Sequence, residues 1–418
     1  YNALESESKV VQFICDEDRK TERFGRGAKI SLLFDATPFY AESGGQVGDT
    51  GYIEFRDSKL EVLDTQKVQN SYYVHHCHVI EGEIDSAVVG QKAHLRVNSM
   101  RRSRIRANHS ATHLVHSALR QVLGEHVKQS GSRVDDSTLR FDYSHFEPVT
   151  EKQINEIESI VNEEIRSNHE VSTRVLPIKE AQKTGAIALF GEKYGEHVRV
   201  VEIGPNSVEF CGGTHVSRSG DIGFCLIAAE TGVSAGVRRI ECFAGPGAHE
   251  EVIREREIRR EIAELVKSSE AHVRDKIQKL VARVRELERE LEQANSRVAS
   301  SQNQKLEQFA RVSPAGIKVI AERVDNADVK VLRGMVDELR HKLGSGVVAL
   351  ASHQGSSAVL VAGVTPDLAG KVHAGNLIQA AASISGGRGG GRADFAQAGG
   401  GDPGKLQDAL EHLFRQIS

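Results

Sequence analysis

The chain of 418 residues lacks the features of secreted and membrane proteins. It shows no signal-peptide pattern and no apolar run long enough to cross a bilayer. Its five cysteines are scattered and odd in number, so no disulfide framework is indicated, and a reducing, cytoplasmic location is the simpler expectation. The net charge of −4 excludes an overall basic surface, so any RNA binding has to rely on local patches.

Glycine and proline are absent from residues 248–313. Part of this run carries apolar residues at alternating steps of four and three, which predicts a helix with a heptad seam. An earlier stripe falls out of phase with the seam near Ser268, which indicates a stutter or the turn of a helical hairpin. Unbroken, the run would extend about 100 Å, and we expect a spacer, a dimer interface or both. The stripe comprises Ile258, Ile262 and Leu265, and the seam Val273, Ile277, Leu280, Val284, Leu287, Leu291, Ala294 and Val298.

Two short motifs share a spacing of four residues: His109 with His113, and Cys211 with His215. Residues 109–126 have helical periodicity, and side chains at i and i+4 of a helix lie on one face. The four side chains together offer nitrogen and sulfur ligands suited to one tetrahedral Zn²⁺ per chain. Either pair alone occurs by chance, but the two at matched spacing favour a metal site.

The second motif has a backbone suited to folding back on itself. Cys211 follows two predicted strands, 198–203 and 207–210, and Gly212-Gly213 permits close backbone approach. The residues between His109 and His113 supply no general base, unlike the His-Glu-x-x-His helix of metalloproteases, which argues against a peptidase. Ligand types leave open whether the ion is structural or catalytic.

These motifs carry a resemblance to a known family. His109-Ser-Ala-Thr-His113 followed by Cys211-Gly-Gly-Thr-His215 resembles the editing domain of alanyl-tRNA synthetases, shared by the free-standing AlaX proteins and related to a domain of threonyl-tRNA synthetases. Residues 37–51 resemble the glycine-rich stretch of the β-barrel that precedes this domain. Residues 385–392 resemble the glycine-rich signature of a C-terminal DHHA1 module. The three motifs stand in family order over nearly the whole chain.

The resemblance and the local patterns together imply an α/β multidomain (α+β) architecture. Length alone predicts two to four domains, and the start at Tyr1 rather than Met indicates a piece of a longer protein. We expect a polar, helical or frayed linker remnant at 1–20, a small β-barrel or curled sheet at 21–97, a zinc-binding α/β editing domain at 98–246, a helical coiled-coil segment at 247–313, and a DHHA1-like α/β domain at 314–418. Strands are predicted at 28–34, 51–55, 59–67, 71–79, 93–97, 139–143, 318–322, 347–352 and 358–363, helices at 151–168, 329–343 and 372–383, and a loop at 129–132.

The resemblance implies hydrolysis of the ester that joins serine or glycine, wrongly attached, to tRNA(Ala). Zinc could lower the pKa of a bound water to about 7 or hold the substrate while another water attacks, and both alternatives stay open. Glu209 shares a strand face with Cys211 and is the first candidate to orient a water molecule or a histidine ligand. Asp142 is the second, weaker candidate for the same role. Thr112 and Gln129 are nominated to bind the serine hydroxyl, and the family position matching Gln129 lies near the substrate. A site that hydrogen-bonds a hydroxyl can reject an analogue lacking it by roughly 10⁴.

Arginines and glycines are the predicted RNA contacts. Arg101, Arg102, Arg104 and Arg106 form a basic stripe just before the metal motif, either a solvated face or a phosphate contact. Gly44, Gly45 and Gly48 are turn residues or part of a loop shaped for a phosphate or ribose. Nine of residues 385–404 are glycine, and we expect an ordered loop there that presents Arg388 and Arg392. No Asp-His-His triplet occurs, so phosphoesterase catalysis is unsupported.

The expected partner is tRNA(Ala), with its acceptor end at the zinc site and its body on the C-terminal domain. The helical and C-terminal regions could also support a homodimer. The chain shows no class II ATP-binding core, so we expect only the intact parent to ligate alanine to tRNA(Ala) using ATP. Two alternatives remain: an AlaX-type deacylase acting in trans, and a tRNA-binding module with a purely structural zinc.

Overall fold

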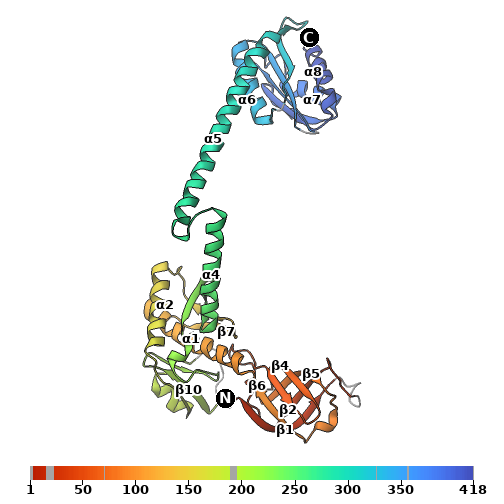
Figure 1. The fold of residues 1–418 in the computed structure, drawn as a ribbon. Helices are drawn as coiled ribbons and strands as arrows, with labels where there is room; N and C mark the ends of the chain where they lie inside the picture. The colour runs from red at the N-terminus through yellow and green to blue at the C-terminus, as the bar shows by residue number, and fades with distance from the viewer. Residues whose placement is uncertain are drawn as a thin grey trace. The chain divides into compact units, whose positions relative to one another are not determined.

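The computed structural model describes residues 3–15, 23–69, 71–188, 195–325, 327–354 and 357–417. The chain divides into two compact units, Tyr1–Ile262 and Ala263–Ser418, which are described separately (Figure 1). Both units combine helices and sheets, so the predicted mixed α/β class is confirmed. Over the described residues, no helix combines the length and the apolar character that a membrane crossing requires.

The first part of unit 1 is a closed barrel of six strands (Figure 1). Neighbours in the order β1-β2-β5-β4-β3-β6 are antiparallel, and β6 pairs with β1 to close it. Buried and less buried residues alternate along several strands, because successive side chains of a strand point to opposite faces. The strands are β1 (Glu5–Ile14), β2 (Lys29–Phe34), β3 (Gly51–Glu54), β4 (Lys59–Val68), β5 (Tyr72–Glu81) and β6 (Lys92–Val97).

The prediction of a helical or frayed linker at residues 1–20 is wrong for residues 5–14. These residues form β1, which pairs with both β2 and β6 and is needed for closure. The strand is hard to see in the sequence because its two most buried positions are Ser8 and Val10, one of them polar. Residues 1–2 and 16–20 of the predicted linker lie outside the described residues.

Two long helices and two antiparallel sheets form the rest of unit 1. Helix α1 (Ser99–Leu123) starts where the Asn98 side chain accepts the backbone N–H of Arg101, and it ends at Gly124, whose φ is 116°. Helix α2 (Glu151–Arg166) starts with a capping box between Thr150 and Gln153. The sheets have the strand orders β12-β13-β8-β7 and β11-β10-β9. Their strands are β7 (Gln129–Val134), β8 (Leu139–Ser144), β9 (Val171–Pro177), β10 (His197–Ile203), β11 (Ser207–Phe210), β12 (Cys225–Ser234) and β13 (Val237–Ala244), with the short helix α3 (Ile178–Ala181) after β9.

Helices α1 and α2 pack on the four-stranded sheet around one apolar core. Ile105, Val115 and Leu119 of α1 meet Phe141 of β8 and Ile157 of α2 there. The loop predicted at 129–132 is instead part of β7, which pairs with β8 through a bulge between Gln129 and Gly131. The core fixes α1, and α1 carries the His109/His113 pair.

Unit 2 contains a six-stranded sheet in the order β14-β15-β16-β17-β19-β18 with helices on both faces. Helices α7 and α8 pack over one core of the sheet, and α6 with the end of α5 packs over the other. The glycine-rich run predicted to be a loop forms the strands β18 and β19 instead. The elements are β14 (Arg311–Val312), β15 (Lys318–Arg323), α6 (Val329–Leu343), β16 (Val347–Gln354), β17 (Ser357–Val364), α7 (Ala374–Ser385), β18 (Arg388–Gly391), β19 (Phe395–Gly399) and α8 (Leu406–Arg415).

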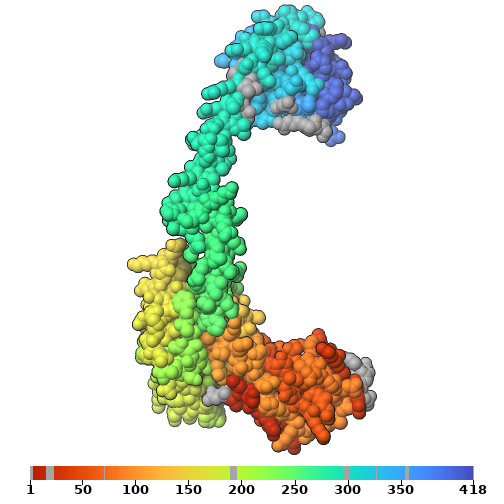
Figure 2. Space-filling view, in the orientation of Figure 1, coloured from red at the N-terminus to blue at the C-terminus, as the bar shows by residue number. Residues whose placement is uncertain are grey.

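The run without glycine or proline forms two helices, α4 (Pro246–Leu265) and α5 (Val273–Leu306). The predicted break near Ser268 is confirmed: Lys267 has a φ of 52°, which cannot continue a helix. Figure 2 shows much of α5 uncovered on the face drawn. Its seam is exposed at Leu280, Val284, Leu287 and Leu291, and the side chain of Val298 lies outside what the structure describes. The coiled-coil pairing of this seam stays a prediction.

Candidate metal centre

His109, His113, Cys211 and His215 converge in unit 1, and their ligand atoms all lie within 4.8 Å of one another. The Sγ atom of Cys211 is 3.4 Å from Nε2 of His109 and 3.3 Å from Nε2 of His215. Ligand atoms around a tetrahedral zinc ion lie roughly 3.3–3.8 Å apart, given bond lengths of about 2.0–2.3 Å. A Cβ at Gly213 would collide with the His109 ring, so glycine at this position is required for the close approach, whereas a Cβ at Gly212 would meet open space.

The three imidazoles are each held at Nδ1, which leaves Nε2 for a metal. Nδ1 of His109 lies 2.7 Å from Oε1 of Gln46, and Nδ1 of His215 lies 3.2 Å from Oγ of Ser110. Nδ1 of His113 lies 2.8 Å from a carboxylate oxygen of Glu209. The buried Nε2 of His113 has no hydrogen-bond partner among the described residues. Metal-binding histidines use their second nitrogen in this way, so the cluster fits a zinc ion.

The charges of the cluster favour a thiolate ligand. Burial would raise the pKa of the Cys211 thiol, but the neighbouring imidazoles, His109 first, lower it well below its usual range. Burial would also raise the pKa of Glu209, but His113 and His116 lower it to about 2. The buried carboxylate therefore stays charged and holds the His113 ring by a charge-assisted hydrogen bond. The thiolate is the form of cysteine that ligates metals.

A cavity of about 370 Å³ opens beside the cluster. Thr112 and Gln129, which were predicted to bind substrate, both line it together with His109, His113 and Cys211. The hydroxyl of Thr112 donates to the backbone oxygen of Asn108, and Nε2 of Gln129 donates to Oγ of Ser132. The barrel also contributes to the wall, through Tyr40, Ser43, Gly44 and Lys67.

The two carboxylates predicted as candidates lie in different places. Glu209 is 2% exposed and sits behind His113, so it faces the cluster and not solvent. Asp142 lies on β8, does not line the cavity and binds Arg239 through both oxygens, at 2.7 and 2.9 Å. Asp142 is therefore not a candidate to orient water at the cluster.

Several residues at the cluster were not predicted. Gln46 and Ser110 hold two of the ligand imidazoles, His116 shares Glu209 with His113, and Arg199 donates to the backbone oxygens of Cys211 and Gly213. Ser110 and Gln46 lie inside the quoted motifs, which is a signal that could have been used. His116 follows His113 by three positions on α1, the other spacing that keeps residues on one helix face.

Three family models match parts of the chain. They are "tRNA synthetases class II (A)" at residues 1–101, "Threonyl and Alanyl tRNA synthetase second additional domain" at 198–241 and "DHHA1 domain" at 316–418. The chain is 48% identical over 403 residues to the alanine–tRNA ligase of Anaeromyxobacter dehalogenans, an alignment that covers 96% of this chain and 44% of the relative. The chain belongs to the alanyl-tRNA synthetase family.

Other alanyl-tRNA synthetases match equally broadly. The alanine–tRNA ligase of Xanthomonas campestris pv. campestris is 45% identical over 411 residues, which covers 98% of this chain and 46% of the relative. The chain thus spans less than half the length of these curated relatives. The solved C-Ala domain from Aquifex aeolicus alanyl-tRNA synthetase is 32% identical, with 26% of this chain and 94% of that chain covered and a TM-score of 0.24.

The arginine stripe before the candidate metal cluster is not a free basic face. The prediction that Arg102 contacts RNA is wrong, because Arg102 is fully buried and pairs with Asp49. Arg101 binds Asp136 and the backbone of Gly48, and Arg104 binds Glu250. Arg106 is half-buried, and burial lowers the pKa of its guanidinium. Arg101, Arg104 and Arg106 stay predictions as RNA contacts.

The two glycine-rich motifs of the chain differ in exposure. A Cβ at Gly45 would collide with Ser132, and one at Gly48 with the backbone of Thr65, so these residues permit close packing, while Gly44 has a φ of 56° and lines the cavity. In unit 2, Arg388 and Arg392 are exposed on and beside the edge strand β18. Nε of Arg392 lies 3.4 Å from Oδ1 of Asp394. Both arginines stay predictions as RNA contacts.

Proposed function

We propose that this chain is the editing part of an alanyl-tRNA synthetase and hydrolyses the ester that joins serine or glycine to the 3′-terminal ribose of tRNA(Ala). The observation that carries the proposal is the convergence of His109, His113, Cys211 and His215 beside a cavity that Thr112 and Gln129 also line. The cavity, of about 370 Å³, is large enough for an aminoacyl group. The ligand set is of the kind that binds Zn²⁺.

His109, His113, His215 and Cys211 would hold the zinc ion, one per chain. When bound, the ion supplies Lewis acidity beside the ester, which lowers the barrier to attack by water. The chain's own residues shape the site: Glu209, Gln46 and Ser110 each hold one imidazole at Nδ1. Such preorganisation means that the ligands need little rearrangement.

Thr112 and Gln129 would distinguish serine from alanine. The hydroxyl hydrogen of Thr112 is committed to the Asn108 carbonyl, which leaves its oxygen to accept a hydrogen bond from a serine hydroxyl. Gln129 carries both an acceptor and a donor at the cavity wall. With alanine in place of serine, the Thr112 oxygen and the Gln129 acceptor would lack this additional partner, and discrimination of up to roughly 10⁴ becomes available. Glycine would be admitted by its size.

The rest of the chain would bind the tRNA. Lys67 and His197 are exposed at the cavity and supply a cationic and a polar side chain, respectively, near the expected position of the acceptor end. The DHHA1 domain would contact the tRNA body through Arg388 and Arg392, and the α5 seam would support a homodimer. The intact parent would ligate alanine to tRNA(Ala) using ATP in the cytoplasm.

The test is deacylation of Ser-tRNA(Ala) and Ala-tRNA(Ala) by the chain, with bound zinc counted. We expect selective cleavage of the serine ester, and loss of both zinc and cleavage in Cys211→Ala. Cys15→Ala is the matched control, because Cys15 is a half-buried thiol of the barrel outside the cavity. A zinc-loaded chain that binds tRNA and cleaves neither ester would contradict the proposal and favour a structural zinc.

A further inference from the structure

The loop between β2 and β3, residues 37–50 and here called the barrel loop, extends from the barrel to the metal cluster. Backbone hydrogen bonds join it to β7: Val47 N–H donates to the Val134 oxygen at 3.1 Å, and Val134 N–H donates to the Gly45 oxygen at 2.8 Å. The loop therefore runs along β7 as a short parallel bridge between Gln46 and Val134. This pairing brings a barrel residue, Gln46, to the editing site.

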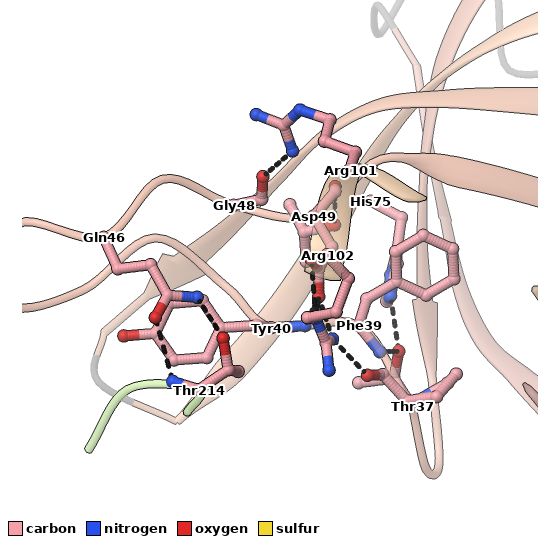
Figure 3. Close-up of polar contacts among 12 residues, drawn as sticks. Thr37, Phe39, Tyr40, Gln46, Gly48, Asp49, His75, Arg101, Arg102 and Thr214 are labelled. Atoms are coloured by element: carbon pink, nitrogen blue, oxygen red, sulfur yellow. Dashed lines mark hydrogen bonds and ion pairs between the residues drawn. The ribbon is translucent and has the colours of Figure 1, made fainter. Parts of the chain in front are cut away.

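The Gln46 side chain is fully buried and has three polar contacts at the cluster, two of them with Thr214 (Figure 3). Its Oε1 lies 2.9 Å from the backbone nitrogen of Thr214 and 2.7 Å from Nδ1 of His109. Its Nε2 donates to Oγ1 of Thr214 at 3.0 Å. Both polar atoms of the Gln46 amide are thus hydrogen-bonded to Thr214, the residue that precedes His215.

These contacts decide which nitrogen of His109 carries the proton. A backbone N–H can only donate, so the Gln46 atom facing Thr214 N is the carbonyl oxygen. The same oxygen faces Nδ1 of His109, which must then be the protonated nitrogen. Nε2 is left with its lone pair 3.4 Å from the Cys211 sulfur, where a metal would be bound. Gln46 therefore selects the metal-binding tautomer of His109.

The barrel loop is fastened to the helix that carries His109. Arg102, in the first turns of α1, donates to both carboxylate oxygens of Asp49 and, at 3.0 Å, to the backbone oxygen of Pro38 (Figure 3). Arg101 donates to the backbone oxygen of Gly48 at 2.7 Å. The Asp49 carboxylate in turn accepts the backbone N–H of Tyr40 at 2.6 Å. Both ends of the loop are thereby fixed relative to α1.

We propose that Gln46 is a positioning residue of the metal centre, through which the barrel holds His109 in the orientation and tautomer that bind zinc. The inference rests on the proposed function only in taking the cluster as a zinc site. It makes the affinity for zinc depend on a residue of the barrel, in addition to the four ligands and to Glu209 and Ser110. Loss of such a partner of a metal ligand lowers metal affinity roughly 10- to 100-fold.

The test measures zinc affinity by competition with a chromophoric chelator for the parent chain, Gln46→Ala, Gln46→Glu and the control Gln91→Ala. Gln91 is an exposed barrel glutamine whose side chain contacts only Ala87 in the contacts described. We expect Gln46→Ala to lose roughly 10- to 100-fold in affinity. Gln46→Glu should restore most of it, because a carboxylate oxygen still accepts from His109 and Thr214. Gln91→Ala should match the parent.

Cobalt substitution supplies a readout that a general loss of stability would not change. We expect the visible spectrum of the Co²⁺-loaded Gln46→Ala variant to differ from that of the parent, and the Gln46→Glu spectrum to resemble it. Equal zinc affinity and equal cobalt spectra for the parent and a folded Gln46→Ala would overturn the inference. Should that variant not fold, Thr214→Val, which removes the acceptor for Gln46 Nε2, is expected to lower affinity, and an unchanged value would overturn it. A parent chain that binds no zinc would instead refute the proposed function.

Discussion

A carboxylate oxygen of Glu209 lies 2.8 Å from Nδ1 of His113, and the pair is buried. The other oxygen lies 2.8 Å from Nδ1 of His116, whose ring packs on Phe141 at a centroid distance of 5.0 Å. One carboxylate thus anchors a ligand imidazole and a second imidazole that touches the apolar core. The metal centre is linked through it to the packing of the domain.

Replacing this carboxylate by an amide tests that link. In Glu209→Gln one of the two imidazole N–H groups would face an NH₂ group, so a donor would oppose a donor. We expect zinc affinity to fall roughly 10- to 100-fold, measured by chelator competition, and deacylation to fall with it. Glu202→Gln is the control, because Glu202 lies on the adjacent strand and pairs with Arg174 at a partly exposed position. Equal affinity in both variants would refute the role of Glu209.

The buried pair of Arg102 and Asp49 should dominate the stability of the barrel–helix junction. Arg102→Met leaves an uncompensated buried carboxylate, and we expect unit 1 to lose about 3–5 kcal/mol of unfolding free energy. Arg104→Met, which breaks the partly exposed pair with Glu250, should cost about 0–1 kcal/mol. Urea titrations followed by circular dichroism measure both. Similar losses of unfolding free energy in Arg102→Met and Arg104→Met would contradict the prediction that the buried pair dominates the stability of the junction.

His75 should make the barrel sensitive to acid. Its Nδ1 donates to the Leu32 oxygen and its Nε2 accepts from Thr37, so the neutral ring is fully paired (Figure 3). Burial lowers the pKa of His75 from 6.5 to about 4. The unfolded chain therefore binds the proton first, and stability present above pH 6.5 is lost as the pH falls toward 4. Between pH 7.5 and 5 this site should cost about 2 kcal/mol.

The measurement compares unfolding free energies at those two pH values in His75→Gln and in the control His76→Gln. His76 is the next residue on β5 and is exposed. We expect the pH dependence of the parent to persist in His76→Gln and to shrink by about 2 kcal/mol in His75→Gln. An undiminished pH dependence in His75→Gln would show that other groups cause it.

The seam of α5 should hold two chains together. Leu280 is 44% exposed and Leu287 46% exposed, one heptad apart. We expect the double variant Leu280→Glu/Leu287→Glu to sediment as a monomer at concentrations where the parent is a dimer, because a heptad seam depends on apolar contacts. Ala282→Glu/Arg289→Glu, on the opposite face of the helix, is the control. A parent that is monomeric at all concentrations would remove the dimer proposal.

Much of the fold could be predicted because local patterns decide it. Helical periodicity over 109–126 predicted the helix that carries His109 and His113, although α1 already begins at Ser99, and alternating residues predicted most barrel strands. β1 was missed because Ser8 occupies an inward position that apolar residues usually fill. The strand β7 was missed because glycine and serine at 129–132 have low strand propensity, and pairing with β8 overrides it.

The convergence of His109, His113, Cys211 and His215 could be predicted because they lie in two compact motifs, while Gln46 and other residues that hold them come from distant parts of the chain. Zinc binding by the four stays a prediction. Gln46 is 63 positions before His109 and 168 before Thr214. Arg102 was read as a surface arginine, since nothing in its own neighbourhood indicates that Asp49 lies 53 positions earlier with its carboxylate buried. Contacts of this kind depend on how the barrel packs against α1 and β7, which no local sequence pattern predicts.

The pairing of the barrel loop with β7 has a practical consequence for dividing this protein into pieces. Sequence motifs suggest a cut near residue 98, between the barrel and the helix of the cluster. A cut there would remove the backbone hydrogen bonds between Val134 and the barrel loop. It would also leave Arg102 without the carboxylate of Asp49, and the His109 ring without its hydrogen bond to Gln46. The smallest piece that keeps an intact metal centre therefore begins with the first barrel strand.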